Sequence, residues 1–122
     1  MQNLMYVFLG GGLGSVLRYG IGVYFSGVNT DFPLGTFVVN ALACIILGVL
    51  IGFQLKNNLQ SNYSLLFISG FCGGFSTFSA FSGESLKLFQ NQQFALGLIY
   101  IGGSILIGLL AVYLGIKLQS IF

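Results

Sequence analysis

The chain has 122 residues, of which 56% are hydrophobic and 5% charged, and its mean hydropathy is +0.96. A soluble domain carries about a quarter charged residues, so this composition excludes an ordinary soluble protein and predicts a membrane protein with one domain over 1–122. Six charged side chains are too few for a nucleic-acid-binding face. The net charge of +2 is spread along the chain without a cluster of lysine and arginine, so it does not favour a peripheral protein held on anionic lipid.

Four segments are apolar over the roughly 20 residues that a helix needs to cross the hydrocarbon of a bilayer. They run from about Leu4 to Phe25, Leu34 to Leu55, Tyr63 to Phe89, and Phe94 to Leu118. The first segment has neither a basic start nor a small-residue cleavage site, so we interpret it as a retained span rather than a signal peptide. The expected fold class is an all-α membrane protein with four transmembrane helices per subunit and both termini on one side.

The lysines give a weak orientation signal. Lys56 and Lys117 fall on the side of the termini and Lys87 falls on the other side. Orientation follows the excess of lysine and arginine in short cytoplasmic loops. Insertion in both orientations is therefore as compatible with the sequence as a single orientation.

Glycine pairs predict close helix packing. The spacing of four residues that lets membrane helices approach each other occurs at Gly10/Gly14, Gly48/Gly52 and Gly70/Gly74. Four helices packed in this way leave little room for a water-filled path inside one subunit, so we expect an oligomer.

The segment G-F-C-G-G-F-S-T-F-S-A-F-S-G-E at 70–84 mixes glycines, hydroxyls and phenylalanines. Irregular backbone persists inside a membrane only where it is buried in protein or lines a wet cavity, so this segment predicts a pore or a binding site. Phe78 and Phe81, with Phe75 one step back, share a face if the chain resumes helical form after the glycines. They are either packing residues or, together with neighbouring hydroxyls such as Ser79, an anion-selective track that uses the positive ring edges.

Three polar side chains need partners inside these spans. Arg18 either snorkels or pairs with a backbone group, or it forms an electropositive vestibule. Asn40 either bridges two helices or donates its NH₂ group to a dehydrated anion. Glu84 either pairs with Lys87 three residues later, or it shapes the vestibule or compensates Arg18.

These motifs resemble the Fluc/CrcB family of fluoride channels over nearly the full chain. The resemblance is carried by G-G-G-L-G-S-V-L-R-Y at 10–19, L-G-T-F-V-V-N at 34–40 and the run at 70–84. It implies a fluoride-selective channel, not an enzyme, that exports cytoplasmic fluoride passively across the plasma or inner membrane. It also implies an antiparallel dual-topology dimer with two pores between the subunits and a third helix that is broken at mid-membrane.

The resemblance also implies roles for individual residues. The implied fluoride pore residues are Asn40, Phe78, Phe81, Ser79, Tyr100 and Ser104, and the implied vestibule residues are Arg18 and Glu84. With no histidine and two acidic residues, a metal site built from side chains is not expected. The resemblance instead implies a structural Na⁺ at the dimer axis, held by the backbone carbonyls of Gly73 and Ser76. A broken helix exposes such carbonyls.

One position departs from the family pattern, since Ala80 stands where a threonine is usual and part of the polar track is missing. We expect identical subunits; the alternative is a pair of unlike subunits, as in some members of the family. Two other classes of function are alternatives. A small multidrug-type exchanger needs an embedded acid, typically early in the chain, whereas the first span holds Arg18 and no carboxylate. In a non-transporting scaffold subunit, the buried polar groups would only fasten helices together.

Overall fold

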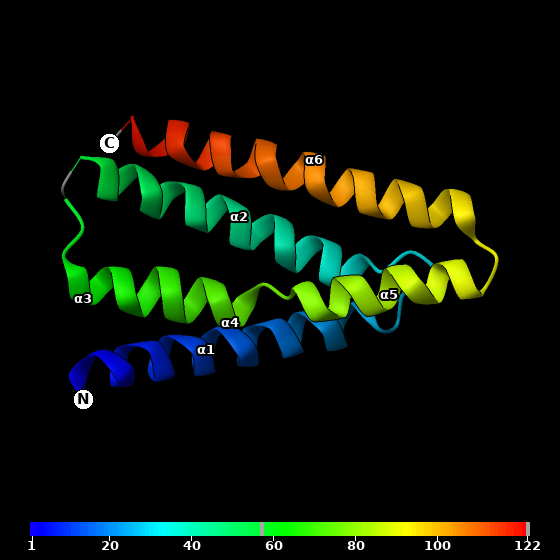
Figure 1. Ribbon diagram of the computed structural model, residues 1–122, viewed down its shortest axis with the longest axis horizontal. Helices are drawn as coiled ribbons and strands as arrows, with labels where there is room; N and C mark the ends of the chain where they lie inside the picture. The colour runs from blue at the N-terminus through cyan, green and yellow to red at the C-terminus, as the bar shows by residue number, and fades with distance from the viewer. Residues whose placement is uncertain (57, 122) are drawn as a thin grey trace.

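The computed structural model describes residues 1–56 and 58–121. Among these, four helical stretches are long and apolar enough to cross a membrane, namely Gln2–Phe25, Leu34–Leu55, Ser61–Gln90 and Phe94–Gln119. The N- and C-termini lie at the same end of the molecule (Figure 1). The structure thus confirms the predicted all-α membrane protein with four spans, and the ends of the spans lie close to the expected ones.

Three of the spans are single helices, α1 (Gln2–Phe25), α2 (Leu34–Leu55) and α6 (Phe94–Gln119). The third span is divided into α3 (Ser61–Ser64), η1 (Leu65–Cys72), α4 (Gly73–Phe75) and α5 (Phe78–Gln90). The element η1 is a π-helix, in which each amide donates to the carbonyl five residues earlier, so its turns are wider than those of an α-helix. No sequence pattern predicted this widening.

Two pairs of helices pack through glycine. In Figure 1, α1 runs beside α3–α4 and α2 runs beside α6. A Cβ on Gly70 would lie 3.0 Å from the Cα of Gly10, and a Cβ on Gly115 would lie 2.9 Å from the Cα of Gly48. Backbones approach this closely only where a side chain is absent, because such a Cβ would overlap the neighbouring helix. The packing role predicted for the glycine pairs is confirmed.

A small core joins the two pairs of helices. Val39 and Ala43 of α2 are buried against Phe75 at the end of α4, and Phe71 and Ile46 pack against this cluster. Many large apolar side chains of α1 and α6 instead face outward. An apolar exterior is what a helix surface in contact with lipid requires.

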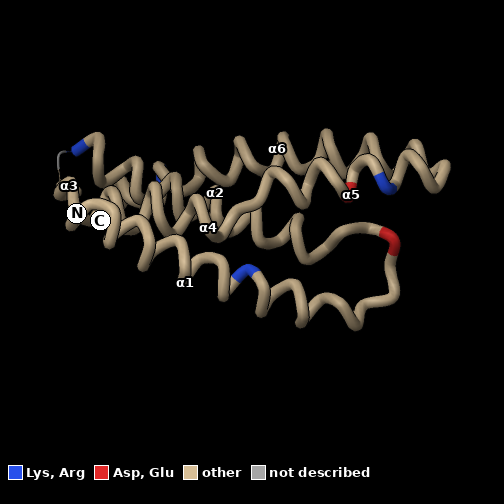
Figure 2. The backbone as a smooth tube through the Cα atoms, turned by 60° about the horizontal axis from the view of Figure 1, so that its bottom comes forward, with Lys and Arg blue, Asp and Glu red and all other residues tan. Residues whose placement is uncertain are grey.

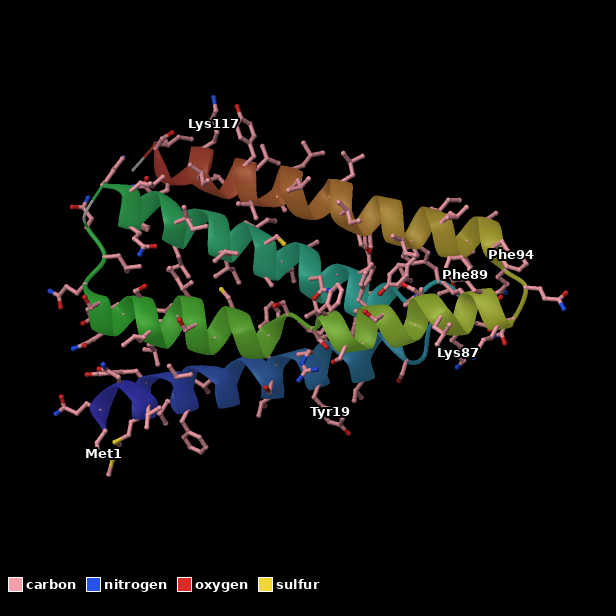
Figure 3. The ribbon with its side chains drawn as sticks, in the orientation of Figure 1. Met1, Tyr19, Lys87, Phe89, Phe94 and Lys117 are labelled. Carbon is pink, nitrogen blue, oxygen red and sulfur yellow. The ribbon has the colours of Figure 1, made fainter. Side chains whose placement is uncertain are left out.

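Charged residues are sparse along the backbone tube in Figure 2, where the acidic segments lie in the loop after α1 and on α5. In Figure 3, Lys117 lies toward the end that holds the termini and Lys87 lies toward the opposite end. The lysines are thus divided between the two ends of the bundle, as the sequence predicted.

Candidate functional site

The third span is interrupted between α4 and α5. Ser76 (φ −74°, ψ 157°) and Thr77 (φ −149°, ψ 110°) have extended backbone, and α5 begins at Phe78. Thr77 is the N-cap of α5, because its Oγ1 accepts a hydrogen bond of 3.3 Å from the amide of Ala80. A threonine in this position satisfies one of the amides that the start of a helix leaves unpaired, which stabilises the new start of the helix.

The interruption begins after Ser76 and redirects the amide of Thr77. The amide and the hydroxyl of Ser76 both donate to the carbonyl of Cys72, at 3.0 and 2.8 Å. In a continuous α-helix the amide of Thr77 would donate to the carbonyl of Gly73. It donates instead to the Oδ1 of Asn40 on α2, at 2.9 Å. The carbonyl of Gly73 therefore loses its usual helical donor.

An open groove of about 270 Å³ runs beside this interruption. It is lined by Asn40, Cys44, Ser76, Thr77, Phe78, Phe81, Ser104 and Ile105. None of these side chains is charged, and the polar groups among them include amide and hydroxyl donors. The hydroxyl of Ser104 is buried without a hydrogen-bond partner among the described residues. The groove thus offers donors to an anion inside an apolar frame.

Four of the six residues predicted to line a pore lie together in this groove: Asn40, Phe78, Phe81 and Ser104. Ser79 does not line it; its hydroxyl lies 3.3 Å from the Oγ1 of Thr77.

Glu84 is held by two hydroxyl groups. Thr36 Oγ1 donates to Glu84 Oε1 at 2.7 Å, and the Tyr100 hydroxyl donates to Glu84 Oε2 at 2.8 Å. Tyr100 is completely buried, so this predicted pore residue acts on Glu84 rather than lining the groove. Hydrogen bonds to a carboxylate are stronger than those between neutral groups. Thr36 was not predicted as a site residue, although its position four residues before Asn40 places both on one face of α2.

A series of aromatic rings joins the groove to Glu84. The ring of Phe81 lies 5.8 Å from that of Phe78 and 5.2 Å from that of Tyr100, measured between centroids. Phe78 is 80% exposed, at the open side of the groove. Phe75, which shares the sequence spacing, is buried in the core instead and stacks on Phe71.

Arg18 stands apart from these contacts. Its Nε is buried and has no hydrogen-bond partner among the described residues, and the side chain does not line the groove. Nearby on α1, the hydroxyl of Ser15 donates to the carbonyl of Gly74 at 3.4 Å. The vestibule role predicted for Arg18 stays a prediction.

The chain matches a known protein family over most of its length. Residues 5–116 match the profile of the family described as CrcB-like protein, Camphor Resistance (CrcB). A relative from Phocaeicola vulgatus, named fluoride-specific ion channel FluC, is 46% identical over 122 residues, which cover 98% of this chain and 100% of the relative.

Two further relatives carry the same name. The one from Flavobacterium psychrophilum is 43% identical over 118 residues, which cover 95% of each chain. One from Thermus thermophilus is 39% identical over 119 residues, which cover 97% of this chain and 94% of the relative. A match of this extent, on a bundle of four apolar helices, shows that the chain is a multi-pass membrane protein of the CrcB family of fluoride-specific ion channels and not an enzyme.

Proposed function

We propose that this chain is a fluoride-selective channel that lets cytoplasmic fluoride leave the cell passively, driven by the membrane potential and the concentration gradient. The relatives match nearly the whole chain and are named fluoride-specific ion channels, which supports fluoride as the ion that this chain conducts. One observation in the chain itself carries the proposal. The groove contains no charged side chain and is joined to Glu84 by the ring contacts of Phe81 with Phe78 and Tyr100.

This arrangement suits a small anion that must shed water. In an apolar environment a bare anion is costly unless donors replace its hydration shell. The NH₂ group of Asn40 and the hydroxyls of Thr77 and Ser104 are such donors, and the positive edges of Phe78 and Phe81 add a favourable field. Neutral hydrogen fluoride crosses lipid and dissociates in the cytoplasm, and the anion left behind needs a protein path to leave.

The groove is open along one side of a single subunit, so a closed pore requires a second wall. We propose that a second, identical subunit provides it in an antiparallel, dual-topology dimer, with two pores at the interface. The polar groups of the groove support this, because donors such as Asn40 and Thr77 on an open side of the subunit would otherwise face lipid, which cannot satisfy them. The division of Lys87 and Lys117 between the two ends of the bundle also fits insertion in both orientations.

The interruption at Ser76 and Thr77 is proposed to lie at mid-membrane, and the residues before it suit a structural Na⁺ at the dimer axis. The carbonyl of Gly73 lacks the donor that Thr77 would supply in a continuous helix. The carbonyl of Ser76 belongs to extended backbone outside both helices. Hard cations bind carbonyl oxygens of this kind, so both groups would hold the ion without carboxylates. The cell membrane, plasma or inner, is the proposed location.

Fluoride efflux from liposomes that contain the purified chain tests this function. We expect fluoride to leave on addition of a potassium ionophore while chloride is retained, as read by ion-selective electrodes. Empty liposomes are the control. Equal fluxes of the two anions would overturn fluoride selectivity, and exchange of cations driven by a pH gradient would indicate an exporter instead. Absence of flux from the chain alone would contradict a channel made of identical subunits.

A further inference from the structure

Two hollows other than the groove meet at Glu84. Their volumes are about 260 and 330 Å³. The residues that line both are Thr30, Phe32, Pro33 and Glu84. Phe32, from the loop between α1 and α2, thus lines both of the hollows that reach the carboxylate of Glu84.

The ring of Phe32 covers the tyrosine that binds Glu84. It lies 5.4 Å from the ring of Tyr100 at an interplanar angle of 85°, and 5.3 Å from the ring of Phe37 at 70°. These are edge-to-face pairs, which stabilise aromatic clusters beyond simple burial. Phe81 contacts the same Tyr100 ring, which is completely buried. Phe32 and Phe81 together therefore enclose Tyr100.

The loop that carries Phe32 is fastened at several points. The amide of Phe32 donates to Thr30 Oγ1 at 3.2 Å, and its carbonyl accepts from the amide of Leu34 at 2.7 Å. The residue before it, Asp31, accepts a hydrogen bond of 2.7 Å through Oδ2 from Nε2 of Gln93. Gln93 directly precedes α6, so this bond ties the loop after α1 to the loop after α5. We name the Asp31–Gln93 bond the clasp.

We infer that Phe32 is a positioning residue for the fluoride pathway, and that the clasp keeps its ring against Tyr100 so that the Tyr100 hydroxyl stays on Glu84. The inference rests on the proposed function. Without the ring, water from the two hollows reaches the hydroxyl and competes for it. Glu84 then loses a donor, and its less compensated negative charge opposes an anion on the same path.

Fluoride efflux from liposomes tests the clasp through Gln93. Gln93→Leu removes the donor to Asp31, and we expect it to slow efflux about fivefold, the effect of one lost hydrogen bond of ordinary strength. Gln93→Lys keeps a donor for Asp31 and should restore most of the rate. Gln90→Leu makes the same chemical change at an exposed neighbour outside the clasp and is the matched control. Equal rates for the wild type and Gln93→Leu would overturn the role of the clasp.

The denaturant midpoint of unfolding tests the link to Tyr100 independently of transport. We expect Phe32→Ala to lower the midpoint more in the wild type than in a Tyr100→Phe background, where the hydroxyl that Phe32 protects is already absent. Equal shifts in the two backgrounds would show that Phe32 does not act through this hydroxyl. A chain that shows the coupling but passes no fluoride would contradict the proposed function and leave the positioning of Tyr100 established.

Discussion

Asn40 Oδ1 accepts the backbone amide of Thr77 at 2.9 Å, which joins α2 to the interruption of the third span across 37 residues of sequence. This contact draws the amide away from the carbonyl of Gly73 and pins the start of α5. It uses only the oxygen of the carboxamide. The NH₂ group of Asn40, which also lines the groove, is the part left to donate to an anion. The two roles considered for Asn40 are therefore compatible in one side chain.

Substitution of Asn40 separates these two roles. Asn40→Asp keeps an acceptor for the Thr77 amide but replaces the NH₂ donor with a carboxylate oxygen, which repels an anion, so we expect a folded protein whose fluoride efflux falls roughly tenfold or more. Asn40→Leu also orphans the Thr77 amide and should lower the free energy of unfolding by about 1–3 kcal/mol. Fluoride efflux from liposomes measures the effect of Asn40→Asp. The denaturant midpoint of unfolding measures the effect of Asn40→Leu. Normal efflux through Asn40→Asp would show that the NH₂ group has no part in permeation.

Phe78→Ile and Phe81→Ile test the aromatic rings. Each keeps an apolar side chain but removes the positive ring edge, so we expect fluoride efflux to fall roughly tenfold in either variant while assembly persists. Phe67→Ile is the matched control, because Phe67 is a partly exposed phenylalanine on η1 that stacks on Tyr63 away from the groove. Efflux that is as strongly reduced in Phe67→Ile as in the groove variants would contradict a specific role for the rings.

Gly14→Ala tests the packing of α1 against the third span. Its Cβ would lie 2.7 Å from the amide nitrogen of Phe75, so the helices must separate, at a cost of about 1–3 kcal/mol. Gly12→Ala makes the same change on the same helix, where no described atom lies within 4 Å, and should be neutral or slightly stabilising. Unfolding in a detergent titration compares the two. Equal stabilities would mean that this glycine contact is not close in the membrane.

Gly73→Val tests the proposed cation site. No described atom lies within 4 Å of the position its Cβ would take, so the subunit should fold with unchanged helical content. We expect the added side chain to obstruct a second subunit and to abolish any stabilisation of the dimer by Na⁺ over K⁺, measured by thermal unfolding in each salt. Gly83→Val is the control, because it too has open space around its Cβ. Retention of Na⁺-dependent stability in Gly73→Val would show that the cation does not bind at this position.

Spacing in the sequence did not predict all of the contacts and exposures that the fold produces. Phe75 and Phe78 are three residues apart, yet Phe75 is 3% exposed and Phe78 is 80% exposed. The extended backbone at Ser76 and Thr77 lies between them and rotates α5 relative to α4, so helical periodicity does not continue across it. The expected partners of Glu84 were Lys87 or Arg18, whereas Thr36 and Tyr100 hold its carboxylate.

Four features could be predicted from the amino-acid sequence alone: the membrane class, the four spans, the glycines at helix contacts and the segment that carries polar groups into the bilayer. These features follow from local composition, because the length of an apolar run and the cost of unpaired polar groups in lipid do not depend on distant residues. The partners of Glu84, the bond from Thr77 to Asn40 and the contact of Phe32 with Tyr100 became visible only in the folded chain. Those contacts join segments far apart in the chain, and their geometry is set by how α2, α5 and α6 pack together.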